Sequence, residues 1–214
     1  MQPWRRSLIV AFGAIGLVGA AAAVATITET PTATGLGSRL AARLDPETAA
    51  AVQHLVDSVN TAKLPGSVVE DKALEFQAKG ASDDEIVDAA RLSGVNLGRA
   101  RTALGDKSTV DELRWGGTAL DAGLQARELA RLRAAAPKRS LATALVVACD
   151  LITTGVDVST TADLVVQMMR AGVKDSELLL FQQNVNMDIG RGVRPPVTAT
   201  ARARGAIDRN RRTR

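Results

Sequence analysis

Aromatic residues, histidine and cysteine are scarce in this chain of 214 residues. Aromatic residues make up 2% of the sequence, Tyr is absent, and there is one His and one Cys. Few aromatics argue against strand-rich folds, which favour ring and β-branched side chains, and against sites that stack sugars or bases on rings. The core must therefore be built from Leu, Val, Ile and Ala, and this favours an all-helical fold.

The single histidine and the single cysteine exclude several kinds of site. One Cys cannot form an internal disulfide, and metal clusters built from Cys or paired His are excluded by number alone. Cys149 stands in the apolar stretch ALVVACDLI and is predicted to be a small buried residue. His54 has no Ser or Cys in local register and is predicted to lie at a helix surface or to be half-buried. Calcium-loop and phosphate-loop spacings are also missing, so we expect no metal, no cofactor and no catalytic residue.

The beginning of the chain predicts export. Arg5 and Arg6 precede an unbroken apolar run over residues 8–27, and the sequence Ala-Val-Ala ending at Ala25 has the small residues of a cleavage site. Residues 1–25 are therefore either a signal peptide or part of an uncleaved anchor, since the apolar run is about 20 residues long, enough to span a membrane. The two arginines also partly resemble a twin-arginine signal. Each interpretation places the rest of the chain outside the cytoplasm, in the periplasm or beyond the cell.

Start and stop signals divide the chain after a flexible linker over residues 26–38. Ser67, Ser82 and Thr109 each stand three residues before a Glu, the spacing of a capping box that opens a helix. A glycine followed by an apolar residue predicts a Schellman stop, in which glycine takes a left-handed conformation just past the helix end. This phrase occurs at Gly80, Gly123, Gly155, Gly172 and Gly192. Residues 39–193 are therefore predicted to form a compact all-α bundle of about seven or eight short antiparallel helices.

The recurring glycine phrase has no fixed period. The spacings between successive stops are 43, 32, 17 and 20 residues, so the phrase is predicted to be helix punctuation, with only a weak case for degenerate helix pairs. Residues 140–154 are apolar nearly all round and predict the central helix of the bundle. That segment holds Asp150 and is too short to span a membrane.

Glycines inside two predicted helices destabilise those helices, and another interaction is expected to offset this cost. Gly94 and Gly98 lie four residues apart, and each costs about 1 kcal/mol relative to Ala inside a helix. Close packing or a kink is the predicted compensation, with a ligand groove as the alternative. Gly116 and Gly117 pose the same choice directly after Trp115. Trp115 is predicted to be a core residue, with a partner surface as the alternative.

The C-terminal end is strongly basic. Residues 191–214 contain eight Arg and one acid, whereas residues 26–190 contain 17 Lys and Arg against 22 Asp and Glu. Pro195 and Pro196 are predicted to prevent a helix from continuing, so residues 194–214 are predicted to be a disordered basic tail. An acidic body with a basic tail suggests an anionic partner, either membrane headgroups or an envelope polymer, and the alternative is a solubilising tail. The predicted contact residues are Arg202, Arg204, Arg209, Arg211, Arg212 and Arg214.

The function expected from these features is binding. The absence of tail aromatics argues against nucleic acid as the partner. The first interpretation is a non-enzymatic binding or scaffolding module of the cell envelope with an unknown protein partner. One alternative is a membrane-tethered subunit of an envelope complex. Another is an enzyme that uses an acid such as Asp150, Asp163 or Asp188 in a groove between helices.

Overall fold

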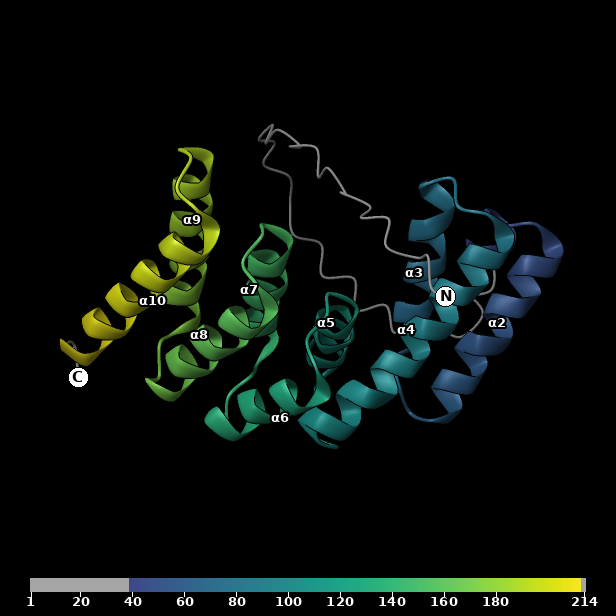
Figure 1. The fold of residues 1–214 in the computed structure, drawn as a ribbon. Coiled ribbons are helices and arrows are strands. Elements are labelled where there is room, and N and C mark those ends of the chain that lie inside the picture. The colour runs from purple at the N-terminus through teal and green to yellow at the C-terminus, as the bar shows by residue number, and fades with distance from the viewer. Residues whose placement is uncertain (1–38, 213–214) are drawn as a thin grey trace, which may run out of the picture. The chain divides into compact units, whose positions relative to one another are not determined.

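The computed structural model describes residues 39–212, and helices are the only regular secondary structure among them (Figure 1). The all-helical prediction is therefore confirmed for this part of the chain. The predicted leader, the linker over residues 26–38 and Arg214 lie outside the described residues. None of the helices within residues 39–212 is long and apolar enough to cross a membrane. The helices are α2 (Pro46–Thr61), α3 (Gly66–Ala78), α4 (Asp83–Leu104), α5 (Val110–Asp121), α6 (Ala126–Ala135), α7 (Ala142–Thr153), α8 (Val158–Arg170), α9 (Asp175–Gly190) and α10 (Pro195–Arg212).

The helices from α4 onward are arranged in two layers (Figure 1). α4, α6, α8 and α10 pack side by side in one layer, and α5, α7 and α9 form the other. At the start of the described chain α2, α3 and α4 pack on one another. Short turns join successive helices, so the chain forms helical hairpins that stack on their neighbours, as in repeat proteins. Residues 39–193 hold helices α2 to α9.

The five glycine stops explain the hairpins. All five glycines have a positive φ, between 72° and 107°. In every case the N–H of the following residue donates to the carbonyl five residues earlier, which is the bond that defines a Schellman motif. The bonds run from Ala81 to Phe76, Leu124 to Ala119, Val156 to Leu151, Val173 to Met168 and Val193 to Asp188, at 2.9–3.1 Å. The predicted stops are confirmed, and they end helices without imposing a sequence period.

Two of the three predicted capping boxes are present. Ser82 and Thr109 cap α4 and α5 reciprocally with the glutamates three residues on. The box predicted at Ser67 is wrong, because α3 begins at Gly66 and the N–H of Gly66 donates to Asn60 Oδ1 at 3.1 Å. The preceding helix thus caps α3, and Glu70 is fully buried instead of reaching back to a cap.

The prediction of a disordered tail is wrong for residues 195–212, which form helix α10. Pro195 and Pro196 occupy its first turn, where a helix N–H has no intrahelical partner and proline is well tolerated. Ala199, Ala203 and Ala206 are almost completely buried, because α10 packs against α8 and α9. The prolines therefore separate two helices and do not mark the end of the folded chain.

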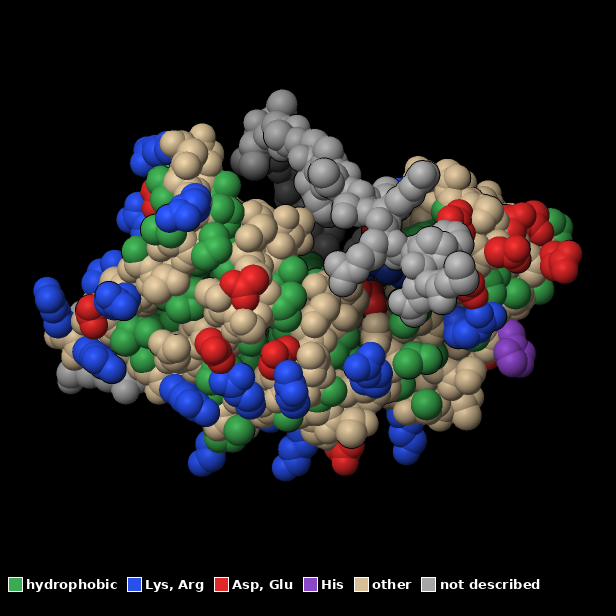
Figure 2. Space-filling model, in the orientation of Figure 1, with side chains coloured by type: hydrophobic (Ala, Val, Ile, Leu, Met, Phe, Trp, Pro, Cys, Tyr) green, Lys and Arg blue, Asp and Glu red, His purple; other side chains and the backbone are tan. Residues whose placement is uncertain are grey.

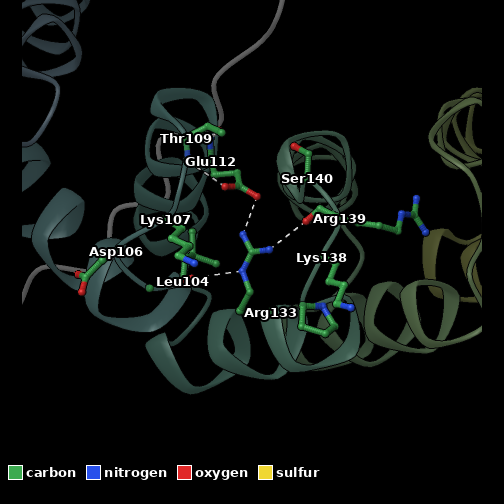
Figure 3. Close-up of a pocket in the computed structure, with 11 residues that line it drawn as sticks. Leu104, Asp106, Lys107, Thr109, Glu112, Arg133, Lys138, Arg139 and Ser140 are labelled. Atoms are coloured by element: carbon green, nitrogen blue, oxygen red, sulfur yellow. Dashed lines mark hydrogen bonds and ion pairs between the residues drawn. The ribbon is translucent and has the colours of Figure 1, made fainter.

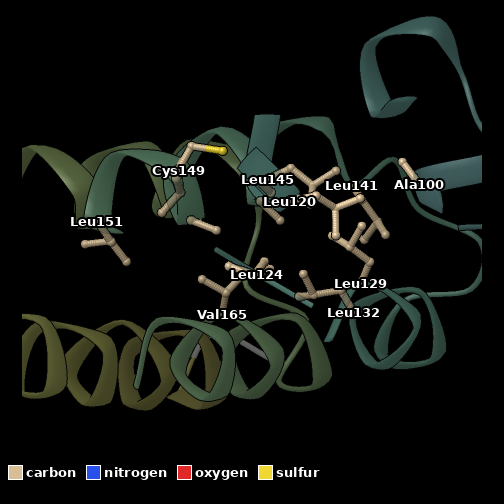
Figure 4. Packing of buried hydrophobic residues seen from close by; sticks show 14 of the residues in the cluster. Ala100, Leu120, Leu124, Leu129, Leu132, Leu141, Leu145, Cys149, Leu151 and Val165 are labelled. Atoms are coloured by element: carbon tan, nitrogen blue, oxygen red, sulfur yellow. The ribbon is translucent and has the colours of Figure 1, made fainter. Parts of the chain in front are cut away.

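Leucines fill the space between the layers (Figure 4). α7 lies between α5 and α9 and against α8, and this position explains why its sequence is apolar nearly all round. Its Cys149 is 7% exposed, as predicted for a buried thiol. Burial, followed by the charges of Asp121 and Asp150, raises the pKa of Cys149 to about 12, so the thiol stays protonated at neutral pH.

Close packing accounts for two of the helix glycines. A Cβ on Gly94 would lie 3.0 Å from Val59, and one on Gly116 would lie 3.0 Å from Leu104 and 3.1 Å from Ala100. α4 continues through both of its glycines without a break. A Cβ on Gly98 would meet nothing within 4 Å, so close packing does not explain that glycine.

Candidate functional site

Helix ends collect at two opposite edges of the stack, because successive helices alternate in direction. At one edge the α2–α3, α4–α5, α6–α7 and α8–α9 loops lie next to one another and end at the last turn of α10. Four side chains bridge neighbouring segments of this edge by donating to backbone carbonyls. The bonds run from Arg101 to Lys63 at 3.5 Å, Arg133 to Leu104 at 3.2 Å, Arg139 to Val173 at 2.9 Å and Asn210 to Ala171 at 2.8 Å.

The two edges carry opposite charge. The first comprises residues 61–66, 101–112, 133–142, 170–177 and 207–212, with eleven Lys and Arg against six Asp and Glu. The second comprises residues 43–48, 78–85, 119–128, 150–158 and 187–198, with five Lys and Arg against ten Asp and Glu. We name them the basic edge and the acidic edge. Figure 2 shows blue side chains in a row along the lower margin, where α6 and the ends of α4 and α8 lie.

Neighbouring loops also meet at the acidic edge. A Cβ on Gly123 would lie 3.4 Å from Val158, which places the α5–α6 turn beside the start of α8. A Cβ on Gly155 would lie 3.6 Å from Pro195, which places the α7–α8 turn beside the start of α10. The charge of each edge therefore belongs to a continuous row of loops.

Helix polarity explains part of this separation. α4, α6, α8 and α10 all end at the basic edge and carry Arg in their last turns, where a cation interacts favourably with the helix dipole. The same layer begins at the acidic edge, where Asp83, Asp84 and Glu85 occupy the first turn of α4. Each charge is locally a helix-end charge, and the alternation of direction gathers them at one edge.

A buried ion pair joins the helix ends at the middle of the basic edge (Figure 3). Glu112 of α5 is 3% exposed, and its Oε1 lies 2.6 Å from Arg133 Nη2 of α6. The same Oε1 accepts the N–H of Leu141 at 2.8 Å, and Oε2 accepts the N–H of Thr109 at 2.9 Å. Arg133 also donates to the carbonyls of Leu104 and Arg139.

The Glu112 carboxylate at this junction is held in its ionised form. Burial alone pushes the pKa of Glu112 upward, but the N–H groups of Thr109 and Leu141 and the Arg133 guanidinium hold that pKa below its ordinary value. The carboxylate therefore stays ionised. The bonds of the pair reach Leu104 at the end of α4, Thr109 before α5 and Leu141 before α7, and Arg133 itself lies at the end of α6, so the pair joins four helix ends.

A hollow of about 470 Å³ opens beside this junction. Lys107, Lys138 and Arg139 lie on its wall together with Ser140 (Figure 3). Arg139 is held at the loop by Asp175, whose Oδ1 is 2.8 Å from Arg139 Nη2. Lys107 and Lys138 are exposed. The hollow is therefore a basic depression in the middle of the basic edge.

The structure divides the predicted tail arginines into two groups. Arg202 makes two bonds to Asp188, at 2.8 and 2.9 Å, and Arg209 lies 3.4 Å from Glu177, so both attach α10 to α9. Arg204 is exposed on the side of α10 away from its packed face. Arg211 and Arg212 are exposed in the last turn and belong to the basic edge. The five of these arginines that the structure describes therefore belong to a folded helix and not to a disordered tail.

The remaining candidate residues are dispersed. Asp150 is half-buried and accepts from Asn186 at 3.0 Å, whereas Asp163 pairs with Arg131 at 2.7 Å on the surface. Asp188 is engaged by Arg202 and Thr198. None of the three lines the hollow at the junction. Trp115 is half-buried and packs against the core.

The described residues include no group of three or more His, Cys, Asp or Glu placed to hold a metal ion. No protein-family model, curated protein or solved structure matches the chain. The assignment of function therefore rests on the surfaces of this molecule.

The sequence interpretation missed the cations of the internal loops. Successive members of the set Lys107, Lys138, Arg170 and Lys174 are up to 32 residues apart, and each has one or two basic neighbours at most. What these cations share in the sequence is a position within a few residues of a helix end, at every second connection between helices. That signal becomes a surface only when the direction of every helix is known.

Proposed function

We propose that this chain is a non-enzymatic binding and scaffolding module of the cell envelope that docks on an anionic membrane surface through its basic edge. The observation that supports the proposal best is the row of loops that carries eleven cations and six acids along one edge. The proposal moves the anionic contact from a tail to a folded surface, in which Arg211 and Arg212 are the last members.

The geometry of the edge suits a surface better than a small ligand. Its cations lie on long side chains in several loops, so their charged ends can reach outward while their stems cover the helix ends. Lys138, Lys174 and Arg211 are exposed in three different segments. The described edge carries no aromatic side chain. Contact would therefore depend on charge, with each cation near an acidic lipid surface contributing up to about 1 kcal/mol.

A charge-reversal experiment tests the proposal. The variant Lys138→Glu, Lys174→Glu, Arg211→Glu changes three exposed positions of the basic edge. The matched control Arg43→Glu, Arg127→Glu, Arg194→Glu changes three exposed cations of the acidic edge by the same net charge. Co-sedimentation with vesicles that contain acidic phospholipid is measured for both and for the unchanged chain. We expect the first variant to lose about a hundredfold in affinity and the control to lose far less.

Salt and the type of polyanion give two further outcomes. Binding should weaken as added salt shortens the Debye length from about 10 Å at 0.1 M. Equal losses in the two variants, or binding that ignores salt, would show that the basic edge is not the docking surface. Binding to a soluble acidic polysaccharide but not to acidic vesicles would assign the edge to an envelope polymer.

A further inference from the structure

We propose that the two ends of the helix stack bind each other, so that a second copy of this chain docks head to tail through the outer face of the α9–α10 hairpin. This contact is independent of the basic edge, because it uses the apolar end face of the last hairpin and the opposite end face of α2. On each of these two faces the binding partner is another copy of the chain.

The last hairpin has an uncovered apolar face. Among the described helices α9 packs against α7 and α10, and α10 packs against α8 and α9. The buried residues of α9 face these neighbours, whereas Leu180 and Met187, seven residues apart, lie on one opposite stripe. They are 42% and 50% exposed, and Val197 at the start of α10 is 49% exposed. We take these exposed large apolar side chains of α9 and α10 as the interaction surface.

The adjoining stripe of α10 adds positive charge to this face. Val197, Ala201 and Arg204 follow one another at helical spacing on the side opposite the buried Ala199, Ala203 and Ala206. Arg204 and the acid Asp208 are both exposed on this side, and Arg191 at the end of α9 is 72% exposed. The face is therefore an apolar stripe bordered by two arginines and one aspartate.

The opposite end of the stack has the complementary character. Among the described helices α2 packs mainly against α3 and α4, and Ala50, His54 and Asp57 follow its outer side at helical spacing. A shallow hollow of about 330 Å³, lined by small and apolar groups, lies on this helix. Its lining residues are Ala41, Pro46, Ala49, Ala50 and Gln53.

Acids lie along and beside the same helix as that hollow. Asp45, Glu47 and Asp57 are exposed on or beside α2, with Arg43 as the nearby cation. The two halves of the described chain differ in charge in the same direction as the two end faces. Residues 39–121 hold ten Lys and Arg against 14 acids, whereas residues 122–212 hold 14 Lys and Arg against eight acids. Charge complementarity therefore favours contact between unlike ends and opposes contact between like ends.

The shapes agree with the charges. Met187 is a long, half-exposed side chain on the C-terminal face, and the hollow on α2 is a recess of about 330 Å³ whose wall is mostly alanine. A contact between two different faces is heterologous, so a bound pair still presents one unused C-terminal face and one unused α2 face. Such association is open-ended, and further copies continue the stack of helices.

Sedimentation velocity of the full chain over a concentration series at low salt tests the proposal. The average mass of the unchanged chain should rise with concentration. Met187→Glu damages the C-terminal face and Ala50→Arg damages the α2 face. Each variant should lower the association constant by at least about tenfold. The matched control is Leu92→Glu, since Leu92 is 53% exposed on α4 away from both end faces. Circular dichroism checks that all three variants remain helical.

A mixture of the two damaged variants separates the head-to-tail contact from other dimers. Met187→Glu keeps its α2 face and Ala50→Arg keeps its C-terminal face, so together they should form heterodimers that grow no further. A monomer at every concentration of the unchanged chain would overturn the proposal. So would a loss with Leu92→Glu as large as with Met187→Glu, or a failure of the mixture to associate.

Crosslinking gives a second measurement that does not depend on a weakened variant. A chain carrying Met187→Cys and Ala50→Cys should form ladders of disulfide-linked copies under mild oxidation. The native Cys149 is 7% exposed and contributes little background. A chain carrying Leu92→Cys and Ala50→Cys is the control, and ladders of equal yield in the two chains would contradict the assigned contact.

Discussion

In two regions of this molecule an ion pair between a carboxylate and an arginine joins neighbouring helices, but the surroundings of the two pairs differ. At the junction of α4, α5, α6 and α7, the Glu112 carboxylate is 3% exposed and meets Arg133. In the last hairpin the Asp188 carboxylate, whose side chain is 14% exposed, meets Arg202, whose side chain is 44% exposed. A buried pair leaves an uncompensated charge when one partner is removed, whereas an exposed pair exchanges its partner for water. The comparison indicates that the stability of the junction depends on the bonds between Glu112 and its buried partners.

The last hairpin depends on packing of small residues. α10 contributes Ala199, Ala203 and Ala206 to its interface, and these allow the helix to approach α8 and α9 closely. Large side chains at those positions would have no space. The two regions should therefore respond to different substitutions.

The largest expected effect is at the junction. Glu112→Ala removes the partner of Arg133 and of the Leu141 N–H, and should lower the free energy of unfolding by about 3–5 kcal/mol. Glu85→Ala removes the corresponding glutamate from the exposed capping box of α4 and serves as the control, with a much smaller loss. Urea unfolding measures both. Similar losses in the two variants would show that Glu112 acts only as a capping residue.

The next effect is in α10. Ala203 is 1% exposed, so Ala203→Leu should overpack the interface and destabilise the protein by roughly 1–3 kcal/mol. Ala201→Leu lies on the exposed side of the same helix and should change stability by less than about 0.5 kcal/mol. Thermal unfolding compares the pair. If residues 195–212 were a disordered tail, the two substitutions would behave alike.

A smaller effect distinguishes the helix glycines. Gly98→Ala should stabilise the protein by up to about 1 kcal/mol, because alanine favours the helix and its Cβ would meet nothing within 4 Å. Gly116→Ala should fail to stabilise, since its Cβ would press on Leu104 and Ala100. A stabilising Gly116→Ala, measured by urea unfolding, would mean that α4 and α5 can separate without cost.

The smallest effect concerns pH. The Arg202 guanidinium and the Thr198 hydroxyl lower the pKa of Asp188 to about 2 in the folded protein. A lowered folded pKa gives stability that is fully present above the unfolded pKa and is lost as pH falls. Between about pH 4 and about pH 2, Asp188→Asn should therefore reduce the decline of stability with acid. Carboxyl NMR provides the direct reading: in Arg202→Gln the pKa of Asp188 should rise toward its ordinary value, and an unchanged pKa would exclude the ion pair as the cause.

Local signals in the sequence predicted many helix boundaries. The five glycine stops and the boxes at Ser82 and Thr109 are confirmed because their hydrogen bonds join residues within six positions of each other. Ser67 shows the limit of this method. Its spacing matches a box with Ser67 as the N-cap, but the N-cap of α3 is Pro65, two residues earlier, and the side chain of Asn60 in the preceding helix binds the first N–H of α3.

The candidate site was predicted only in part. The excess of arginine at the C-terminal end was visible, but its division between α9 contacts and exposed positions was not. Arg202 and Arg204 are two residues apart in sequence, and one pairs with Asp188 while the other is exposed, because two helical positions correspond to opposite sides. The buried role of Glu112 also required a partner 21 residues away.

Composition and local patterning by themselves determined that the described chain is helical, where most of its helices end, and that Cys149 is buried. Each of these depends on interactions within one or two turns of the chain or on transfer of apolar side chains from water. Only the tertiary structure decided that residues 195–212 form a helix, that Glu112 and Arg133 form a buried pair, and that charges from five separate segments make one basic edge. These features depend on which helices are neighbours and which way each one runs, and short stretches of sequence carry neither.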